Sequence, residues 1–301
     1  MKSRSIASRN KASSFPRPGT PLAEAALLNR RQTNFRQRRD LRVRSEREAL
    51  DFVNAVGFCS TFHVISDGPA SLWEAVVGRP RPRWPRRSHH DAGIGLTWEL
   101  KNVLPHRRLV YYGKLVKARP MLVALDVFPA FYALVRGSQT AREYVREYHA
   151  GRLSVTAKRI MDSLMRESPQ YTRSLRAECF MLEPSKTREF ERAMAELQQG
   201  LWIVKTEERY EPTFSYRWDL LERWLPEPTA KGRRLRRTAA LDHLISRYLR
   251  AAVYATPAGL ARLFAVPRAE IELALTRLAR THGVRAPVEI AGRAGRFVVT
   301  A

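Results

Sequence analysis

The residues best suited to chemistry lie in one short loop, residues 78–91, with the sequence GRPRPRWPRRSHHD. Arginine binds phosphate, and proline restricts the loop so that less entropy is lost when it becomes ordered on a ligand. The loop ends in His90 and Asp91, a pair that can orient water and steady a developing positive charge. Its phosphate-binding candidates are Arg79, Arg81, Arg83, Arg86 and Arg87, and its flat aromatic side chain is Trp84. The alternatives are a solvated surface loop and an aspartate in a salt bridge beside two exposed histidines.

A strong excess of positive charge extends over the whole chain. The 301 residues include 54 Lys and Arg against 29 Asp and Glu, a formal net charge of +25, and the hydrophobic fraction of 44% is ordinary for a globular protein. Such an excess favours a polyanionic partner, and we expect double-stranded DNA, intact or damaged. A membrane partner is not expected, because no apolar run approaches the roughly 20 residues that cross a bilayer.

The cysteine content argues against metal chemistry. Cys59 and Cys179 are far apart, with no CxxC or Cys/His spacing, so neither a metal site nor a cofactor is expected. Two isolated cysteines suit a reducing compartment, and we expect a monomer in the bacterial cytoplasm, associated with the nucleoid. Lys101, which follows Trp98 by three residues, is a further candidate as an amine that could form a Schiff base.

The first 40 residues differ in composition from the rest. They are rich in arginine and serine and contain only two acids, Glu24 and Asp40, so residues 1–40 are predicted to be a flexible basic arm. The first 20 residues also fit an organelle transit peptide. Residues 41–150 are predicted to form an N-terminal module with a buried β-hairpin. Its expected helices span 45–56, 71–77 and 128–135, and its extended segments span 58–64, 109–116 and 121–127.

The C-terminal half contains the same order of elements twice, namely three helices and a hairpin. The first set is predicted at 153–166, 172–180, 184–198, 201–206 and 214–218, and the second at 241–252, 256–264, 267–281, 288–290 and 296–299. The inward positions of the two third helices match, with Phe190, Met194 and Leu197 in one and Ile271, Leu275 and Leu278 in the other. This order is typical of winged helices, predicted here at 151–228 and 229–301, with a basic linker at 231–237 that includes Arg233 and Arg234.

The outward faces of these two third helices differ. One carries Ser185, Arg188, Arg192, Ala195 and Gln199, and the other carries Ala269, Leu273, Thr276 and Arg280. Arginines with small or amide neighbours fit a helix that contacts DNA, so Arg188 and Arg192 are predicted DNA-binding residues. The alternative is that both arginines are merely solvated. The second face is more apolar and is predicted to pack against another domain.

Three further features lie in the N-terminal module. A helix ends in VGFCSTFHV (56–64), an HHDA cluster follows (89–92), and then the run KARPMLVALDV (117–127). Together with the tandem winged helices, residues 45–301 resemble the bacterial DNA glycosylases that repair interstrand crosslinks, the AlkZ/YcaQ-like family. The resemblance implies winged helices around a DNA-binding channel. It also implies metal-independent hydrolysis of the N-glycosidic bond of alkylated or crosslinked bases.

The resemblance also assigns roles to individual positions. The family's catalytic pair, Gln-apolar-Gln or Gln-apolar-Asp, falls on Ser60 and Phe62, and phenylalanine cannot orient water. The family's His-acid-Ala motif matches His90, Asp91 and Ala92, and Arg119 retains the arginine of an Arg-x-Thr-x-His run. Asp91 and His90 are therefore the catalytic candidates, because base excision needs an anionic group beside an oxocarbenium-like sugar.

The sequence thus predicts an α+β, mainly helical protein built of tandem winged-helix modules with short β-hairpins. Two functions stay open. One is a DNA glycosylase-like hydrolase that uses Asp91 and His90 in place of the glutamine pair. The other is a winged-helix protein that binds DNA, or regulates through DNA binding, without cutting it.

Overall fold

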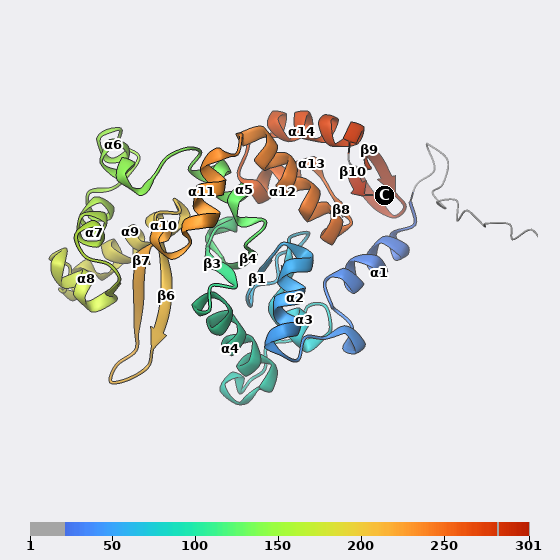
Figure 1. The fold of residues 1–301 in the computed structure, drawn as a ribbon. Helices are drawn as coiled ribbons and strands as arrows, with labels where there is room; N and C mark the ends of the chain where they lie inside the picture. Colours follow the sequence, from blue (N-terminus) through green and yellow to red (C-terminus); the bar gives the residue numbers. More distant parts are fainter. Residues whose placement is uncertain (1–21, 282, 301) are drawn as a thin grey trace, which may run out of the picture.

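The structure is a computed structural model that describes residues 22–281 and 283–300. Three groups of helices, each with its own small sheet, succeed one another along the chain (Figure 1). Helices α6 (Tyr144–His149), α7 (Val155–Arg166), α8 (Thr172–Glu178) and α9 (Thr187–Gln199) lie at one end of the molecule, and α1 (Glu24–Asn34) lies with the last hairpin at the other end. Helix α4 (Ala92–His106) and the hairpin of β6 (Ile203–Arg209) and β7 (Ser215–Leu220) both project from the lower side of Figure 1.

The N-terminal group is built around a four-stranded sheet with strand order β2-β1-β4-β3. Ser45 accepts from the Glu48 backbone N–H and caps the second helix, as expected for serine at an N-cap. The elements are α1 (Glu24–Asn34), η1 (Arg39–Leu41), α2 (Glu46–Val56), β1 (Phe58–Ser60), β2 (Ala70–Ser71), α3 (Leu72–Val77), η2 (Ser88–His90), α4 (Ala92–His106), β3 (Val110–Lys114), η3 (Val116–Ala118), β4 (Pro120–Ala124) and α5 (Phe128–Val135).

The middle group has a three-stranded sheet with strand order β5-β7-β6, in which the long hairpin pairs with one short strand. The elements are η4 (Ala141–Glu143), α6 (Tyr144–His149), α7 (Val155–Arg166), β5 (Gln170–Tyr171), α8 (Thr172–Glu178), η5 (Pro184–Lys186), α9 (Thr187–Gln199), β6 (Ile203–Arg209), β7 (Ser215–Leu220), α10 (Leu221–Trp224) and α11 (Pro226–Arg234).

The last group repeats this arrangement, with strand order β8-β10-β9. Its elements are α12 (Arg237–Ala252), β8 (Tyr254–Ala255), α13 (Pro257–Phe264), α14 (Arg268–Thr281), β9 (Val284–Ile290) and β10 (Arg293–Thr300). The mainly helical α+β class and the two helical units that end in hairpins are therefore confirmed. The six inward positions of α9 and α14 are all buried, as predicted.

The hydrophobic cores do not coincide with the three groups of elements. One cluster joins the N-terminal sheet and α5 to α12, α13 and α14, and a separate cluster lies within the middle group. Phe58 stands at the first junction, with its ring 5.2 Å from Phe131, 5.9 Å from Tyr248 and 6.1 Å from Phe264. The N-terminal and C-terminal groups thus share a core, and the middle group joins it through Leu201, Val204, Leu221 and Leu225 in addition to having a core of its own.

Two predictions about the chain's connections are wrong. Residues 22–40 were predicted as part of a flexible arm, but they contain α1 and are fixed by the buried Phe35 and by hydrogen bonds from Asn34 to the carbonyl groups of Arg250 and Ala251. The predicted linker 231–237 is helical as far as Arg234, because it continues α11. The remainder of the predicted arm and transit peptide lies outside the described residues.

Candidate nucleic-acid interface

The arginine loop, residues 78–91, leaves α3 at a fixed point. Gly78 has a φ of +73°, and a Cβ there would lie 3.0 Å from the Arg38 carbonyl oxygen, so this position requires glycine. The backbone N–H of Arg81 donates to Glu74 at 2.6 Å, and Gln37 donates to the same carboxylate at 2.7 Å. Burial raises the pKa of Glu74, although these two hydrogen bonds oppose the shift. The loop is therefore anchored where it begins.

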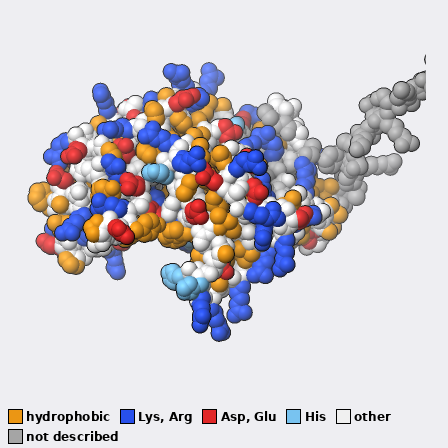
Figure 2. All heavy atoms as spheres, turned by 60° about the horizontal axis from the view of Figure 1, so that its bottom comes forward, with side chains coloured by type: hydrophobic (Ala, Val, Ile, Leu, Met, Phe, Trp, Pro, Cys, Tyr) orange, Lys and Arg blue, Asp and Glu red, His pale blue; other side chains and the backbone are white. Residues whose placement is uncertain are grey.

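Beyond this anchor the basic side chains extend into solvent. Arg79, Arg81, Arg83, Arg86 and Arg87 are all exposed, and none of them forms a side-chain ion pair with the residues that the structure describes. Lysine and arginine side chains gather on one projecting part of the surface, next to histidines, with hydrophobic side chains nearby (Figure 2). Exposed arginines without carboxylate partners can neutralise phosphates without first breaking an ion pair.

Asp91 has a structural role that the sequence did not indicate. It is the N-cap of α4, a helix that was not predicted, and its Oδ1 accepts from the Ile94 backbone N–H at 2.9 Å. His90 is exposed in η2, and no hydrogen bond joins its side chain to that of Asp91 within the described residues. The two side chains are neighbours in the chain without forming an acid–base pair in this structure.

Ser60 and Phe62 stand at the two positions that align with the family's glutamine pair, and both side chains contact other groups of this protein. Ser60 is fully buried, and its hydroxyl donates to the carbonyl groups of His63 and Ala70. Arg119 lies 2.9 Å from His63 Nε2. Burial and the positive charge of Arg119 lower the pKa of His63, which favours the neutral ring as the acceptor. The Ser60 hydroxyl is therefore engaged by backbone carbonyl groups, and the Arg119 guanidinium is in contact with the His63 ring.

Phe62 belongs to an aromatic cluster beside the arginine loop. Its ring centroid lies 5.9 Å from Trp84 and 6.0 Å from Trp98, and Trp84 lies 5.0 Å from the buried Trp73. Trp84 is 52% exposed and Trp98 is 44% exposed, which is unusual for such large side chains. The structure thus brings a loop residue, a strand-end residue and a helix residue together as one exposed aromatic surface.

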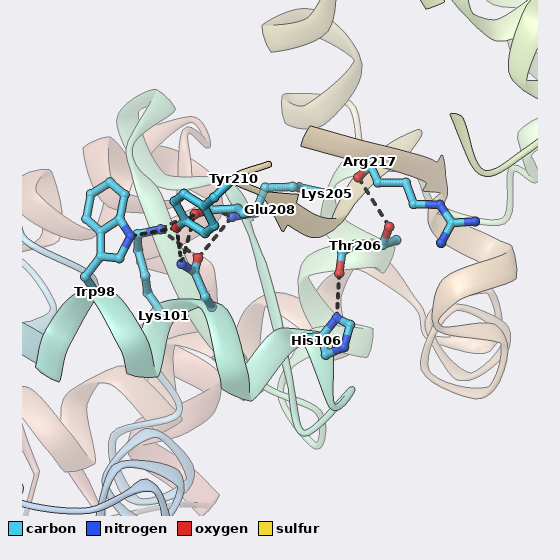
Figure 3. A network of polar contacts seen from close by, with 9 residues as sticks. Trp98, Lys101, His106, Lys205, Thr206, Glu208, Tyr210 and Arg217 are labelled. Carbon is cyan, nitrogen blue, oxygen red and sulfur yellow. Dashed lines mark hydrogen bonds and ion pairs between the residues drawn. The ribbon is translucent and has the colours of Figure 1, made fainter. Parts of the chain in front are cut away.

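A buried polar network connects this helix to the hairpin of the middle group (Figure 3). On α4, Lys101 and Asn102 each donate to Glu208 at 2.9 Å, and Lys205 forms an ion pair with the same carboxylate. Tyr210 donates to Glu208 at 2.8 Å and accepts from Trp98 Nε1 at 3.0 Å. These contacts fix the hairpin against α4, although the middle group has its own core.

The ionisation of the network follows from its burial. The side chains of Lys101, Lys205 and Glu208 are only 4–8% exposed. Burial and the charge of Lys101 lower the pKa of Lys205 to about 8. Burial alone would raise the pKa of Glu208, but the two lysines outweigh it and lower this pKa to about 2. The carboxylate is therefore charged at neutral pH and compensated by two ammonium groups.

Helices α9 and α14 present different surfaces. Arg188 and Arg192 are exposed on α9, opposite its buried face. On α14, Leu273 is 62% exposed, so the prediction that this face packs against another domain is wrong for the described chain. The apolar face is left in solvent because α14 packs on α12 and α13 through its other side.

The two arginines assigned to the linker also differ from each other. Arg233 is half-buried and forms an ion pair with Glu222 at 3.2 Å, and Glu222 also accepts from the Tyr132 hydroxyl at 2.6 Å. Arg234 is exposed. Arg233 therefore helps to hold α11 in place, and only Arg234 is free of such a contact among the described residues.

The network residues Lys205, Glu208 and Tyr210 were not identified from the sequence. The signal available was weak, namely an aromatic residue, Tyr210, in the predicted turn of a hairpin and another, Phe214, at the start of its second strand. Among residues 22–281 and 283–300, no group of three or more His, Cys, Asp or Glu could hold a metal ion. No helix within the same residues is long and apolar enough to cross a membrane.

The fold and this surface define a class of protein, one built of successive helical units with hairpins and a basic, aromatic face. The model of the AlkZ-related family matches residues 43–265, and the chain belongs to that family. The solved structure of the Streptomyces sahachiroi DNA glycosylase AlkZ is similar, with a TM-score of 0.55 at 12% sequence identity, over 94% of this chain and 71% of that chain. No curated protein matches the chain. The resemblance stated from the sequence is thereby confirmed.

Proposed function

We propose that this protein binds double-stranded DNA through the arginine loop and α9, and that it recognises DNA whose bases are damaged or distorted. One observation carries the proposal: five exposed arginines without ion pairs in the described residues share a loop with the exposed ring of Trp84, which is joined to the exposed Trp98 through Phe62. Arginines neutralise phosphates, and aromatic faces stack on bases that have left the duplex. Membership of the AlkZ-related family supports a DNA-repair, glycosylase-like protein.

The remaining arginines that were predicted to bind DNA are expected to contribute to different extents. Arg188 and Arg192 would contact DNA from the exposed side of α9, and Arg234 would add positive charge near α11. Arg119 is assigned to the edge of the aromatic surface, where its guanidinium already meets His63. Arg233 contributes least, because Glu222 neutralises it.

Replacing Arg188 and Arg192 with alanine tests the assignment of α9. We expect weaker binding to duplex DNA and a salt dependence whose slope falls by about two, since each lost phosphate contact removes about one unit. Arg280→Ala is the matched control, because this arginine is exposed on the equivalent helix α14. The affinity is measured by fluorescence anisotropy at several salt concentrations. A larger effect of Arg280→Ala than of the double variant would reverse the assignment of the two helices.

Base release is the second candidate function, and it is favoured by the family and by the exposed position of the arginine loop that leads to Asp91. In this reaction the Asp91 carboxylate would steady the oxocarbenium-like sugar while water adds to its anomeric carbon, and the base would leave with the bonding electrons. His90 would take up a proton from the water. No metal or cofactor takes part in this proposal.

An assay with alkylated duplex DNA, scored for released base, separates the two functions. Asp91→Asn is the useful variant, because asparagine caps a helix as well as aspartate does and α4 should remain intact. If the protein releases bases, this variant is expected to bind DNA normally and release none. Unchanged release would remove Asp91 from the mechanism, and no release by the unaltered protein would leave DNA binding without hydrolysis.

A further inference from the structure

Exposed aromatic side chains continue from the arginine loop to the tip of the hairpin in the middle group. We call this surface the aromatic stripe and define it as Trp84, Phe62, Trp98, Tyr210 and Phe214. Phe62 lies between the rings of Trp84 and Trp98, Trp98 Nε1 donates to the Tyr210 hydroxyl, and the Tyr210 ring lies 5.5 Å from Phe214. Tyr210 is 55% exposed and Phe214 is 52% exposed. Four of the five rings therefore present large areas to solvent.

The stripe is held in shape by the buried network beneath it. Glu208 accepts from Lys101 and Asn102 of α4 and from Tyr210 of the hairpin, so both halves of the stripe are attached to the same carboxylate. Lys101 also lies 3.9 Å from the centroid of the Trp98 ring, where it supports the indole from within the protein. Rings held in place before binding lose little entropy when a ligand stacks on them.

The charge around the stripe indicates what covers it. A protein partner would suit an exposed aromatic surface, but Arg83, Arg86 and Arg87, which form no side-chain ion pair with the described residues, extend from the same loop as Trp84. Glu208, which accepts from the Tyr210 hydroxyl, is buried and compensated by two lysines. Aromatic rings along a positively charged track are the arrangement by which proteins bind single-stranded nucleic acid, with bases on the rings and phosphates on the arginines.

We propose that the aromatic stripe is a binding site for an unpaired DNA strand, whose successive bases stack from Trp84 to Phe214. This inference rests on the proposed function and extends it, because it assigns the substrate class to DNA with single-stranded stretches, such as gaps, bulges or melted ends. The duplex on either side would lie on the arginine loop and α9. Stacking depends little on base identity, so the site is expected to show weak sequence preference.

The test compares an oligothymidylate of about 12 nucleotides with a duplex of similar length, both by anisotropy and by tryptophan fluorescence. The oligothymidylate should bind the unaltered protein and quench its fluorescence, because Trp84 and Trp98 are exposed. Trp84→Ala and Phe214→Ala should each weaken this binding about tenfold, equal to about 1.4 kcal/mol. Phe180→Ala is the matched control, since Phe180 is 79% exposed and lies outside the stripe.

The possible outcomes separate the two proposals. Tenfold losses for Trp84→Ala and Phe214→Ala, with normal binding by Phe180→Ala and with duplex binding largely retained, would support the stripe. Duplex binding without oligothymidylate binding would overturn the stripe and leave the proposed function in place. Oligothymidylate binding that is equal in all variants would also overturn the stripe. Failure to bind either DNA would overturn the proposed function together with the inference.

Discussion

Replacing Glu208 with alanine is expected to lower the free energy of unfolding by about 3–5 kcal/mol, the cost of removing one partner from a buried ion pair. The variant would leave Lys101 and Lys205 buried without their counter-ion. It would also remove the acceptor that Asn102 and Tyr210 share, and with it part of the attachment of the hairpin to α4. Urea unfolding followed by circular dichroism measures the loss.

Glu207→Ala is the matched control, because Glu207 is the neighbouring residue on β6 and pairs with Arg217 at 3.5 Å on a partly exposed surface. Such a pair contributes about 0–1 kcal/mol. Equal losses in the two variants would show that the buried network does not fix the hairpin. Lowering the pH should reduce the free energy of unfolding in the same way as the Glu208→Ala substitution, because it protonates the carboxylate. The pKa of Glu208 is lowered from 4.5 to about 2, so its contribution is complete above pH 4.5 and is lost as the pH falls towards 2.

Replacing the five arginines of the arginine loop with glutamine is expected to weaken binding to duplex DNA by tenfold or more at about 0.1 M salt. The reason is that the side chains of these arginines form no ion pair with the described residues, so their charge is available to phosphates. The salt dependence should become shallower as well, because fewer counter-ions are released on binding.

A smaller pair of variants controls for total charge. Arg86 and Arg87 are both exposed, and so are Arg142 and Arg146, which lie on η4 and α6 at the far end of the molecule (Figure 1). Glutamine at 86 and 87 should weaken binding, while glutamine at 142 and 146 should change it only slightly. If the two pairs behave alike, binding depends on net charge and the loop has no special part in it.

Local patterns in the sequence predicted most of the fold. The spacing of Phe190, Met194 and Leu197 and of their counterparts in α14 identified the buried faces, because helical periodicity is visible within one segment. Helix α4 was missed, since Gly93, Gly95 and Pro105 weaken its helical signal and the cap that starts it is the residue judged catalytic.

The network at Glu208 was missed for a different reason. Lys101 and Glu208 are 107 positions apart, and nothing in either segment alone shows that they meet. Their contact depends on how the hairpin of the middle group lies against α4, which is a property of the packed chain. The same holds for the aromatic stripe, whose members come from a loop, a strand end, a helix and a hairpin.

The central claim, that this protein binds DNA through its arginines, is tested most directly by the affinity of the unaltered protein for a short duplex over a range of salt concentrations. If about six phosphates are neutralised, the logarithm of the association constant should fall with the logarithm of the salt concentration with a slope of about −5. A flat response, or no binding at low salt, would contradict the claim.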